Sequence, residues 1–549
     1  MLEKFCVGLV RILLGGILFF LTLLSAVVTC RVYGGSEIVQ YGRDSLFLHL
    51  FFGAGVIGLT VFYRRRKERK CRKNQWLLLA AAAYLFWILL VPSWGGSDSH
   101  QCMASAQGLL QGDFSAWEPV AYSYGTAEGP LGYAYTYPSQ NGLILYMAVL
   151  AFFFGDAAYV VFQILNIGFF ILGIVSLQRM MVWGNERCSL LLWMACCLPF
   201  SFYILFVYGT MPGFGLSCLA MERLVRYVEE GRGRDFWIGA AAVAAAVILK
   251  SNYEIVLVAL FLYLASSGVF RRKARLLVAA VLLITVYVIG NRGIQTGISS
   301  VTGRTVSDGA PMIAWVQMGL EESKRGPGWY NGYQVKLFQK ADGDADLAAA
   351  WAQADLRKTI SDMAEEPAKA ADFFVRKIES IWAEPTFQSL WIQEVGNTSW
   401  AEESPPWELF KEEGGLNRLY VFAANLLQTF VYAMACVWVI AGMSAKGSRS
   451  KHVLMKRTWE KRIEAEKTVK AVKKQGMETV WERQERGEPD RWGMLLPGIV
   501  FIGGFLFHLV WEAKGQYSVV YFMLLLPYAY LGMERVADVF LDVTGAGKE

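Results

Sequence analysis

Charged side chains are scarce in this sequence. Only 18% of its 549 residues are Asp, Glu, Lys or Arg, against about 25% in soluble proteins. Those charges are clustered, long apolar stretches separate the clusters, and 55% of all residues are hydrophobic. Apolar stretches of this length are typical of membrane spans, so the sequence predicts an all-α protein that crosses a membrane several times.

Motifs of soluble enzymes are absent as well. The sequence has no GxxxxGK[ST] phosphate loop, no HExxH zinc motif and no GxSxG nucleophile motif. Its nine cysteines include no CxxC pair, and it has only four histidines, so no metal-binding set is evident. The net charge of +6 is small and unevenly placed. Such a charge distribution indicates membrane topology and argues against nucleic-acid binding.

Twelve apolar segments of roughly spanning length predict the membrane helices. We therefore expect a bundle of about twelve transmembrane helices with two large outer loops. The predicted spans lie at 7–29, 46–63, 75–92, 157–177, 188–206, 213–228, 236–250, 253–270, 274–291, 417–442, 494–510 and 517–534.

The distribution of basic residues predicts how these segments are oriented. Cytoplasmic loops carry an excess of Lys and Arg. A further apolar stretch at 141–155 is short, and all basic clusters fall on one side of the membrane only if it does not cross. We therefore expect 141–155 to lie on the outer face or dip into it, with both chain termini in the cytoplasm. The basic clusters are 64–73, 179–187, 223–234, 271–275 and 443–493.

This topology divides the chain into eight parts. They are three N-terminal spans (1–92), a first outer loop with juxtamembrane helices (93–156), six spans (157–291), a large outer loop or cap (292–416), one span (417–442), a charged cytoplasmic segment (443–493), two last spans (494–534) and a cytoplasmic tail (535–549).

The first outer loop contains no Lys or Arg and gathers several acids. Asp98 follows the third span closely, and a partly shielded carboxylate at that place can act as a general base. The alternative is an ordinary solvated residue that caps the helix expected to begin near His100. His100 lacks the further ligands that a metal site needs. Asp113 follows Gly112 and is either a turn residue or a second substrate-facing acid.

Aromatic and basic side chains at the outer face complete the candidate set. Five loop tyrosines can stack on sugar rings, or they belong to the aromatic belt of the membrane interface. Lys250 and Lys514 lie at outer ends of spans, against the usual charge bias, where a cation can hold a phosphate. Snorkelling towards water is the alternative for both lysines. The tyrosines are Tyr122, Tyr124, Tyr133, Tyr135 and Tyr137.

Four segments together resemble a known family of membrane enzymes. They read GSDSHQCMASAQGLLQGDFS at 96–115, YPSQNGLILYMAVLAFFFGDAAYVVFQILNIGFF at 137–170, the pair VYGTMPG (207–213) and ILKSNYE (248–254), and HLVWEAKGQYSVVYFMLLLPYAYLG at 508–532. The last is similar to the family's EAKxRY segment. In this order they resemble GT-C fold glycosyltransferases of the protein O-mannosyltransferase and aminoarabinose-transferase-like branch, and still more closely uncharacterised membrane proteins of Gram-positive bacteria.

The resemblance implies an enzyme of the bacterial plasma membrane. Such an enzyme takes a sugar from a polyprenyl-phosphate donor at the outer face and transfers it, with inversion, to a cell-envelope glycan, lipid or protein. Asp98 matches the family's proposed base, and Lys250 and Lys514 match cations that hold the donor phosphate. No cofactor is assigned, and the need for a divalent metal stays open. The remaining candidates for substrate binding are His100, Asp113, Tyr137, Asn252, Gln516 and Tyr517.

Three departures from the family pattern leave alternatives open. Pro212-Gly213 stands where related enzymes often have a second acid, Gln516 replaces the Arg of EAKxRY, and two additional spans precede the usual first one. A transporter or lipid flippase without enzymatic activity therefore remains an alternative. So do a family member that only binds its ligand and a glycan polymerase or ligase that uses a lipid diphosphate.

Overall fold

The molecule is a helical membrane protein, as the composition predicts. A computed structural model describes residues 2–33, 37–65, 73–91, 93, 96–123, 129–181, 193–195, 197, 199–396, 405–412, 414–443 and 492–544. Within these residues the one sheet is an antiparallel hairpin of β1 (Val28–Tyr33) and β2 (Ile38–Arg43), in which Val28 pairs with Arg43. The predicted cytoplasmic segment 443–493 lies almost entirely outside the described residues.

Seven helical stretches among the described residues are long and apolar enough to cross a membrane. The number becomes eight if α9 (Pro199–Leu205) and α10 (Thr210–Glu230), bent by 110° at their break, form one span. The predicted number of twelve is therefore not confirmed. The seven are α1 (Leu2–Val27), Pro138–Met181 with α6 (Asn141–Phe154) and α7 (Ala158–Met181), Ser251–Arg271 with α12 (Glu254–Arg271), α13 (Ala274–Thr302), α20 (Gly415–Ala441), Gly493–Val510 with α23 (Leu496–Val510), and α24 (Gly515–Val543).

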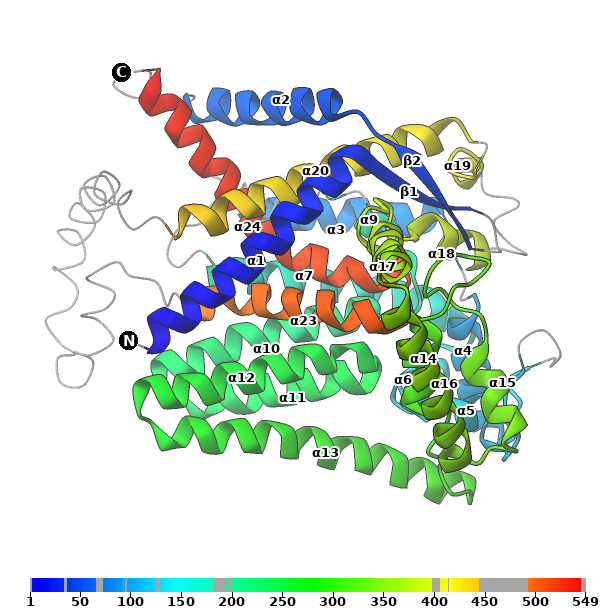
Figure 1. The fold of residues 1–549 in the computed structure, drawn as a ribbon. Coiled ribbons are helices and arrows are strands. Elements are labelled where there is room, and N and C mark those ends of the chain that lie inside the picture. The colour runs from blue at the N-terminus through cyan, green and yellow to red at the C-terminus, as the bar shows by residue number, and fades with distance from the viewer. Residues whose placement is uncertain are drawn as a thin grey trace, which may run out of the picture.

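Three other predicted spans coincide with shorter helices. These helices are α2 (Leu46–Arg65), α3 (Lys73–Leu90) and α11 (Gly233–Leu249). The apolar parts of α2 and α3 cover only Leu46–Phe62 and Gln75–Leu90, and α11 has 17 residues. α3 and α11 pack beside the longer helices α7 and α10 (Figure 1). Helices therefore occur at these three predicted places, although none of the three is among the seven long apolar stretches.

The non-spanning elements collect at one end of the bundle, on the right of Figure 1. The hairpin and the short helices of the first predicted loop, α4 (Asp98–Gln111) and α5 (Tyr133–Thr136), lie there, whereas α1 begins and α24 ends at the opposite end. Which end faces the cytoplasm stays a prediction. The helices of the second loop that lie there are α14 (Met312–Gly319), α15 (Tyr333–Lys340), α16 (Ala345–Glu365), α17 (Pro367–Trp382), α18 (Ser389–Gly396) and α19 (Pro405–Glu408).

Two helix boundaries shape the large loop. α13 continues to Thr302, beyond the predicted span that ends at residue 291. Further along the loop, α16 ends at Glu365 and α17 starts at Pro367. Proline has no backbone N–H and is favoured at the first turn of a helix, so it begins a new one there.

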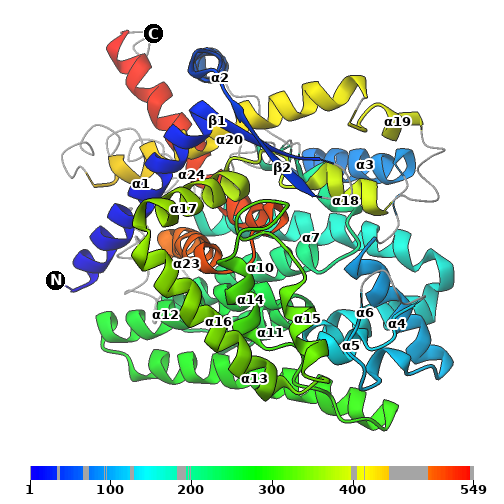
Figure 2. The same ribbon diagram turned by 45° about the vertical axis from the view of Figure 1, so that its right-hand side comes forward.

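The helix predicted at 141–155 is present as α6. It packs against α4, and both lie with α5 in the lower right of Figure 2. The short helix η3 (Gly155–Ala157) joins α6 to α7 without a gap. The placement of α6 on the outer face of the membrane stays a prediction.

The cap is anchored to the bundle through α17. Trp382, at the end of this helix, is 1% exposed and packs on the rings of Phe501 and Phe505. Nearer the middle of α17, the buried Lys377 ammonium donates to the carbonyl oxygens of Leu509 (3.0 Å) and Trp511 (2.7 Å) at the end of α23. These contacts fix the cap against the connection between α23 and α24, which carries part of the site.

Candidate active site

Asp98 is held by a tyrosine of its own loop. α4 begins at Asp98, and Ser97 is the residue before it, so Asp98 lies in the first helical turn and is not the cap. The Tyr133 hydroxyl donates to Asp98 Oδ1 over 3.2 Å. Tyr133 is fully buried while Asp98 is partly exposed. The loop therefore positions this carboxylate and leaves it accessible.

The loop tyrosines pack mainly against one another. The ring centroids of Tyr122 and Tyr133 are 5.3 Å apart, and those of Tyr133 and Tyr137 are also 5.3 Å apart. The Tyr135 hydroxyl donates to the Gly343 carbonyl of the cap, and Tyr124 lies outside the described residues. The rings of Tyr122 and Tyr133 are covered, which makes them structural supports for Asp98 and not open stacking platforms.

Lys250 lies in the connection between α11 and η4 (Ser251–Tyr253). Its side chain is buried, with 7% exposure, so it does not snorkel to the surface. The ammonium donates to Thr210 Oγ1 over 2.8 Å and lies 5.0 Å from the centre of the Tyr208 ring. Burial above all, and Lys514 after it, lower the pKa of Lys250 from its usual 10.5 to about 7, and Asp98 acts in the opposite direction.

The break between α9 and α10 places Thr210 within hydrogen-bonding distance of Lys250. A broken helix leaves carbonyl groups unpaired in an apolar interior, where each needs another donor. Asn166 of α7 donates to the carbonyls of Ile204 and Phe206, both at 3.0 Å. The polar residue in the middle of this span therefore stabilises the break at which α10 begins.

Position 213 has no room for a second acid. A Cβ atom on Gly213 would lie 1.9 Å from Cε2 of Tyr253. The Tyr253 hydroxyl in turn donates to the Thr210 carbonyl. The aromatic ring therefore occupies the space that an acidic side chain at position 213 would need.

The connection from residue 511 to 514 brings an acid and a base to one face. Trp511 and Lys514 have extended backbone angles, and alternate side chains of an extended segment point to the same side. The Ala513 amide donates to the Gly328 carbonyl of the cap over 2.8 Å. Glu512 and Lys514 therefore share the face opposite Ala513.

Both of these charged side chains are nearly enclosed. Glu512 is 2% exposed, and it accepts a hydrogen bond of 3.1 Å from the Tyr517 hydroxyl. Burial raises the pKa of Glu512 to about 7, Lys514 opposes this rise, and Glu37 adds to it. Burial also lowers the pKa of Lys514, but Glu37, Glu512 and Asp98 outweigh it and raise its pKa above that of an ordinary lysine.

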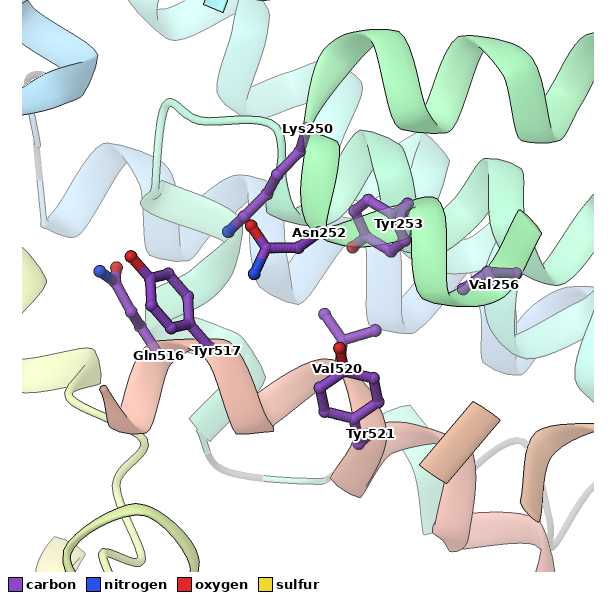
Figure 3. Close-up of a pocket in the computed structure, with 8 residues that line it drawn as sticks. All are labelled: Lys250, Asn252, Tyr253, Val256, Gln516, Tyr517, Val520 and Tyr521. Atoms are coloured by element: carbon purple, nitrogen blue, oxygen red, sulfur yellow. The ribbon is translucent and has the colours of Figure 1, made fainter. Parts of the chain in front are cut away.

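A pocket separates Lys250 from the start of α24. Its cavity volume is about 10 Å³, room for about one water molecule, within about 300 Å³ of space between the side chains that includes open solvent. In Figure 3, Lys250 and Asn252 lie on one side of it and face Gln516 and Tyr517 on the other. At the end of η4 and further along α12 and α24 the lining is mainly apolar and aromatic, with Tyr253, Val256, Val520 and Tyr521. The pocket therefore has a polar end and an apolar end.

The predicted candidates fall into two groups. Asp98 acts electrostatically on both Lys250 and Lys514, and also on the partly buried side chains of Tyr137 and Tyr517. Asn252 and Gln516 line the pocket beside Lys250.

His100 and Asp113 lie apart from this group. Both are exposed. Asp113 accepts a hydrogen bond of 2.9 Å from the Ser115 amide after Gly112 ends α4 in the left-handed conformation, which is a turn role. Among the described residues no group of three or more His, Cys, Asp or Glu side chains is placed to hold a metal.

Three charged residues that reach the site were not predicted from the sequence. Glu512 lies in the segment similar to EAKxRY, where an acid two residues before Lys514 is a signal that it belongs to the site. Glu37 and Arg325 give no such signal, because a hairpin and a cap loop bring them in from distant parts of the chain.

Comparisons with protein-family models, with curated proteins and with solved structures found no match to this chain.

Proposed function

We propose that the protein is a membrane glycosyltransferase that takes a sugar from a polyprenyl-phosphate donor. The observation that carries this proposal is the convergence of Asp98, Lys250 and Lys514. They come from three distant segments and act on one another electrostatically. Lys250 lines a pocket with a polar and an apolar end, and Lys514 lies two residues before the pocket-lining Gln516. This is the combination that a donor with a charged head and a lipid chain requires.

Backbone direction at the site also favours an anion. α10 begins at Thr210 and α24 at Gly515, so two long helices start beside Lys250 and Lys514. A helix N-terminus carries a partial positive charge from its unpaired N–H groups. Because the cavity volume is only about 10 Å³, the pocket has to open to admit the donor. The donor phosphate would then lie between the two lysines, with the first isoprene units extending towards Val256 and Val520.

The proposed reaction is a displacement at the anomeric carbon. The oxygen of the acceptor hydroxyl forms the new glycosidic bond, and Asp98 accepts the proton of that hydroxyl. The bond from the anomeric carbon to the phosphate oxygen breaks, and its electron pair leaves with the polyprenyl phosphate. Lys250 and Lys514 stabilise the additional negative charge on that phosphate.

Glu512 takes the place of the second acid that position 213 cannot accommodate. It is buried at the end of the α23 helix, its hydroxyl partner Tyr517 lines the pocket, and Asp98 and Glu37 both add to the rise in its pKa. We assign it to hydrogen bonding with the sugar or the leaving phosphate. The acceptor is a cell-envelope glycan, lipid or protein at the outer face of a bacterial plasma membrane.

Transfer of labelled sugar in proteoliposomes tests the proposal. Wild type, Asp98→Asn and the matched control Asp113→Asn are given short-chain polyprenyl-phosphate sugars and a cell-envelope extract as acceptor. We expect transfer by wild type and Asp113→Asn and a loss of at least about a hundredfold in Asp98→Asn. Equal transfer by all three proteins would refute the role of Asp98. Movement of lipid or solute without transfer would instead support a flippase or transporter, and transfer only from diphosphate donors would support a polymerase or ligase.

A further inference from the structure

The hairpin between α1 and α2 delivers a buried acid to the site. Glu37 immediately precedes β2, has a positive φ of 55°, and is 2% exposed. Two backbone hydrogen bonds of 2.9 Å dock the hairpin to the cap, from the Cys30 amide to the Ala383 carbonyl and from the Val39 amide to the Arg325 carbonyl. The position of Glu37 is therefore fixed by the hairpin on one side and by the cap on the other.

Both carboxylate oxygens of Glu37 are used. Oε1 lies 3.3 Å from the Lys514 ammonium and accepts a hydrogen bond of 3.1 Å from Gln388 Nε2. Oε2 accepts a hydrogen bond from the Arg325 guanidinium. Gln388 also accepts a hydrogen bond of 3.2 Å from the Gln516 amide in the first turn of α24. The side chain of Gln388, which belongs to the cap, thus connects Glu37 of the hairpin to the start of the last helix.

The ion pair with Glu37 holds the Lys514 ammonium in position and favours its charged form. A buried cation is stable only where opposite charge and hydrogen bonds compensate for lost water. Glu37 is the acid with a direct ion pair to Lys514, whereas Glu512 and Asp98 act over longer range. The cations that oppose the positive charge on Lys514 are Arg325 and Lys250. The centroid of the Trp391 ring lies 5.1 Å from the Lys514 ammonium.

We propose that Glu37 is a positioning residue for Lys514, which makes the N-terminal hairpin a functional part of the donor site. This inference rests on the proposed function for its enzymatic consequence. It gives α1 and α2 a role, because these two helices carry the hairpin at the end of the bundle where the site lies. Loss of the Glu37 charge would leave Lys514 beside Arg325 without its nearest counter-ion.

The test compares two substitutions of Glu37 with a control in the same hairpin. Glu37→Gln keeps the shape and removes the charge, and Glu37→Asp keeps the charge on a shorter side chain. Tyr41→Phe is the control, because the Tyr41 hydroxyl donates only to the Arg376 carbonyl of the cap at 3.3 Å. Folding is checked by the elution profile and melting temperature of each variant in detergent.

Two readouts then decide the proposal. We expect the donor KM of Glu37→Gln to rise at least about tenfold, and more so as pH rises, with partial recovery in Glu37→Asp and little change in Tyr41→Phe. Independently of activity, competitive acetylation followed by mass spectrometry gives the pH midpoint of Lys514 reactivity. That midpoint should fall by about one pH unit or more in Glu37→Gln and stay near that of wild type in Tyr41→Phe.

The outcomes separate this inference from the proposed function. An unchanged Lys514 midpoint in Glu37→Gln, or a uniform loss of activity with an unshifted pH profile, would overturn the positioning role. If Glu37→Gln does not fold, the result with Glu37→Asp decides. A raised donor KM together with the wild-type pH midpoint of Lys514 reactivity supports the positioning role, and an unchanged donor KM overturns it. If wild type transfers sugar from no donor, the proposed function fails, while the labelling result still decides whether Glu37 controls Lys514.

Discussion

Replacing Lys250 by methionine should change how the stability of the protein depends on pH. Because burial lowers the pKa of Lys250 from 10.5 to about 7, the unfolded chain binds one more proton than the folded chain between these two values. The free energy of unfolding of wild type therefore rises with pH through this window. Below pH 7 the lysine is charged in both states and contributes no slope.

The size of the effect follows from the same pKa values. One pH unit within the window is worth about 1.4 kcal/mol for one proton, so Lys250 contributes about 2–3 kcal/mol between pH 7 and pH 9. For a chain of this length, that corresponds to about 2–4 °C in melting temperature. Lys250→Met removes this contribution together with the electrostatic effect of Lys250 on its neighbours, among them Asp98 and Lys514. The difference between the two proteins therefore reports Lys250 and its coupling to these neighbours.

Intrinsic tryptophan fluorescence during heating measures the effect, at a fixed scan rate because membrane proteins often unfold irreversibly. We expect wild type to gain melting temperature relative to Lys250→Met as pH rises from 7 to 9. The variant should also lose sugar transfer by a factor of about a hundred or more, since one charge-assisted phosphate contact is gone. Parallel pH profiles for the two proteins, or full transfer by the variant, would refute this account of Lys250.

Three further predictions concern the residues around the site. Gly213→Asp should lower transfer and melting temperature, because its Cβ would lie 1.9 Å from the Tyr253 ring; faster transfer would show that a second acid is accommodated there after all. Tyr133→Phe should lower kcat about tenfold, since Asp98 loses one hydrogen bond, and an unchanged kcat would contradict that role. Asn166→Leu should destabilise the protein by about 2–4 kcal/mol, because two carbonyl groups lose their donor; a melting temperature equal to that of wild type would contradict this.

The sequence predicted the class of fold well because membrane helices have a direct signal. Long apolar stretches appear in the sequence itself, and helices occur at the expected places except for the predicted span 188–206, which lies largely outside the described residues. The number of spans was harder to predict, because the apolar parts of α2 and α3 and the whole of α11 are short, and because α9 and α10 meet at a bend. Hydropathy measures composition, and it does not distinguish a full span from a shorter or broken helix.

The site was predictable only in part. Asp98, Lys250 and Lys514 were predicted from their places at the ends of apolar segments, and in the structure their charges act on one another, while their roles stay a prediction. Glu37 could not be predicted, because it lies 477 positions before Lys514 in the sequence. The hairpin brings the two side chains together, and no periodicity in the sequence indicates such a contact. The missing acid at position 213 also has a cause that only packing reveals, namely the ring of Tyr253.

The most direct test of the central claim is an experimental structure with a non-hydrolysable polyprenyl-phosphate sugar analogue bound. We predict the phosphate between the ammonium groups of Lys250 and Lys514, the first isoprene units along Val256 and Val520, and the anomeric carbon on the side of Asp98. A phosphate bound elsewhere, with the pocket between Lys250 and Tyr517 unchanged, would contradict the account.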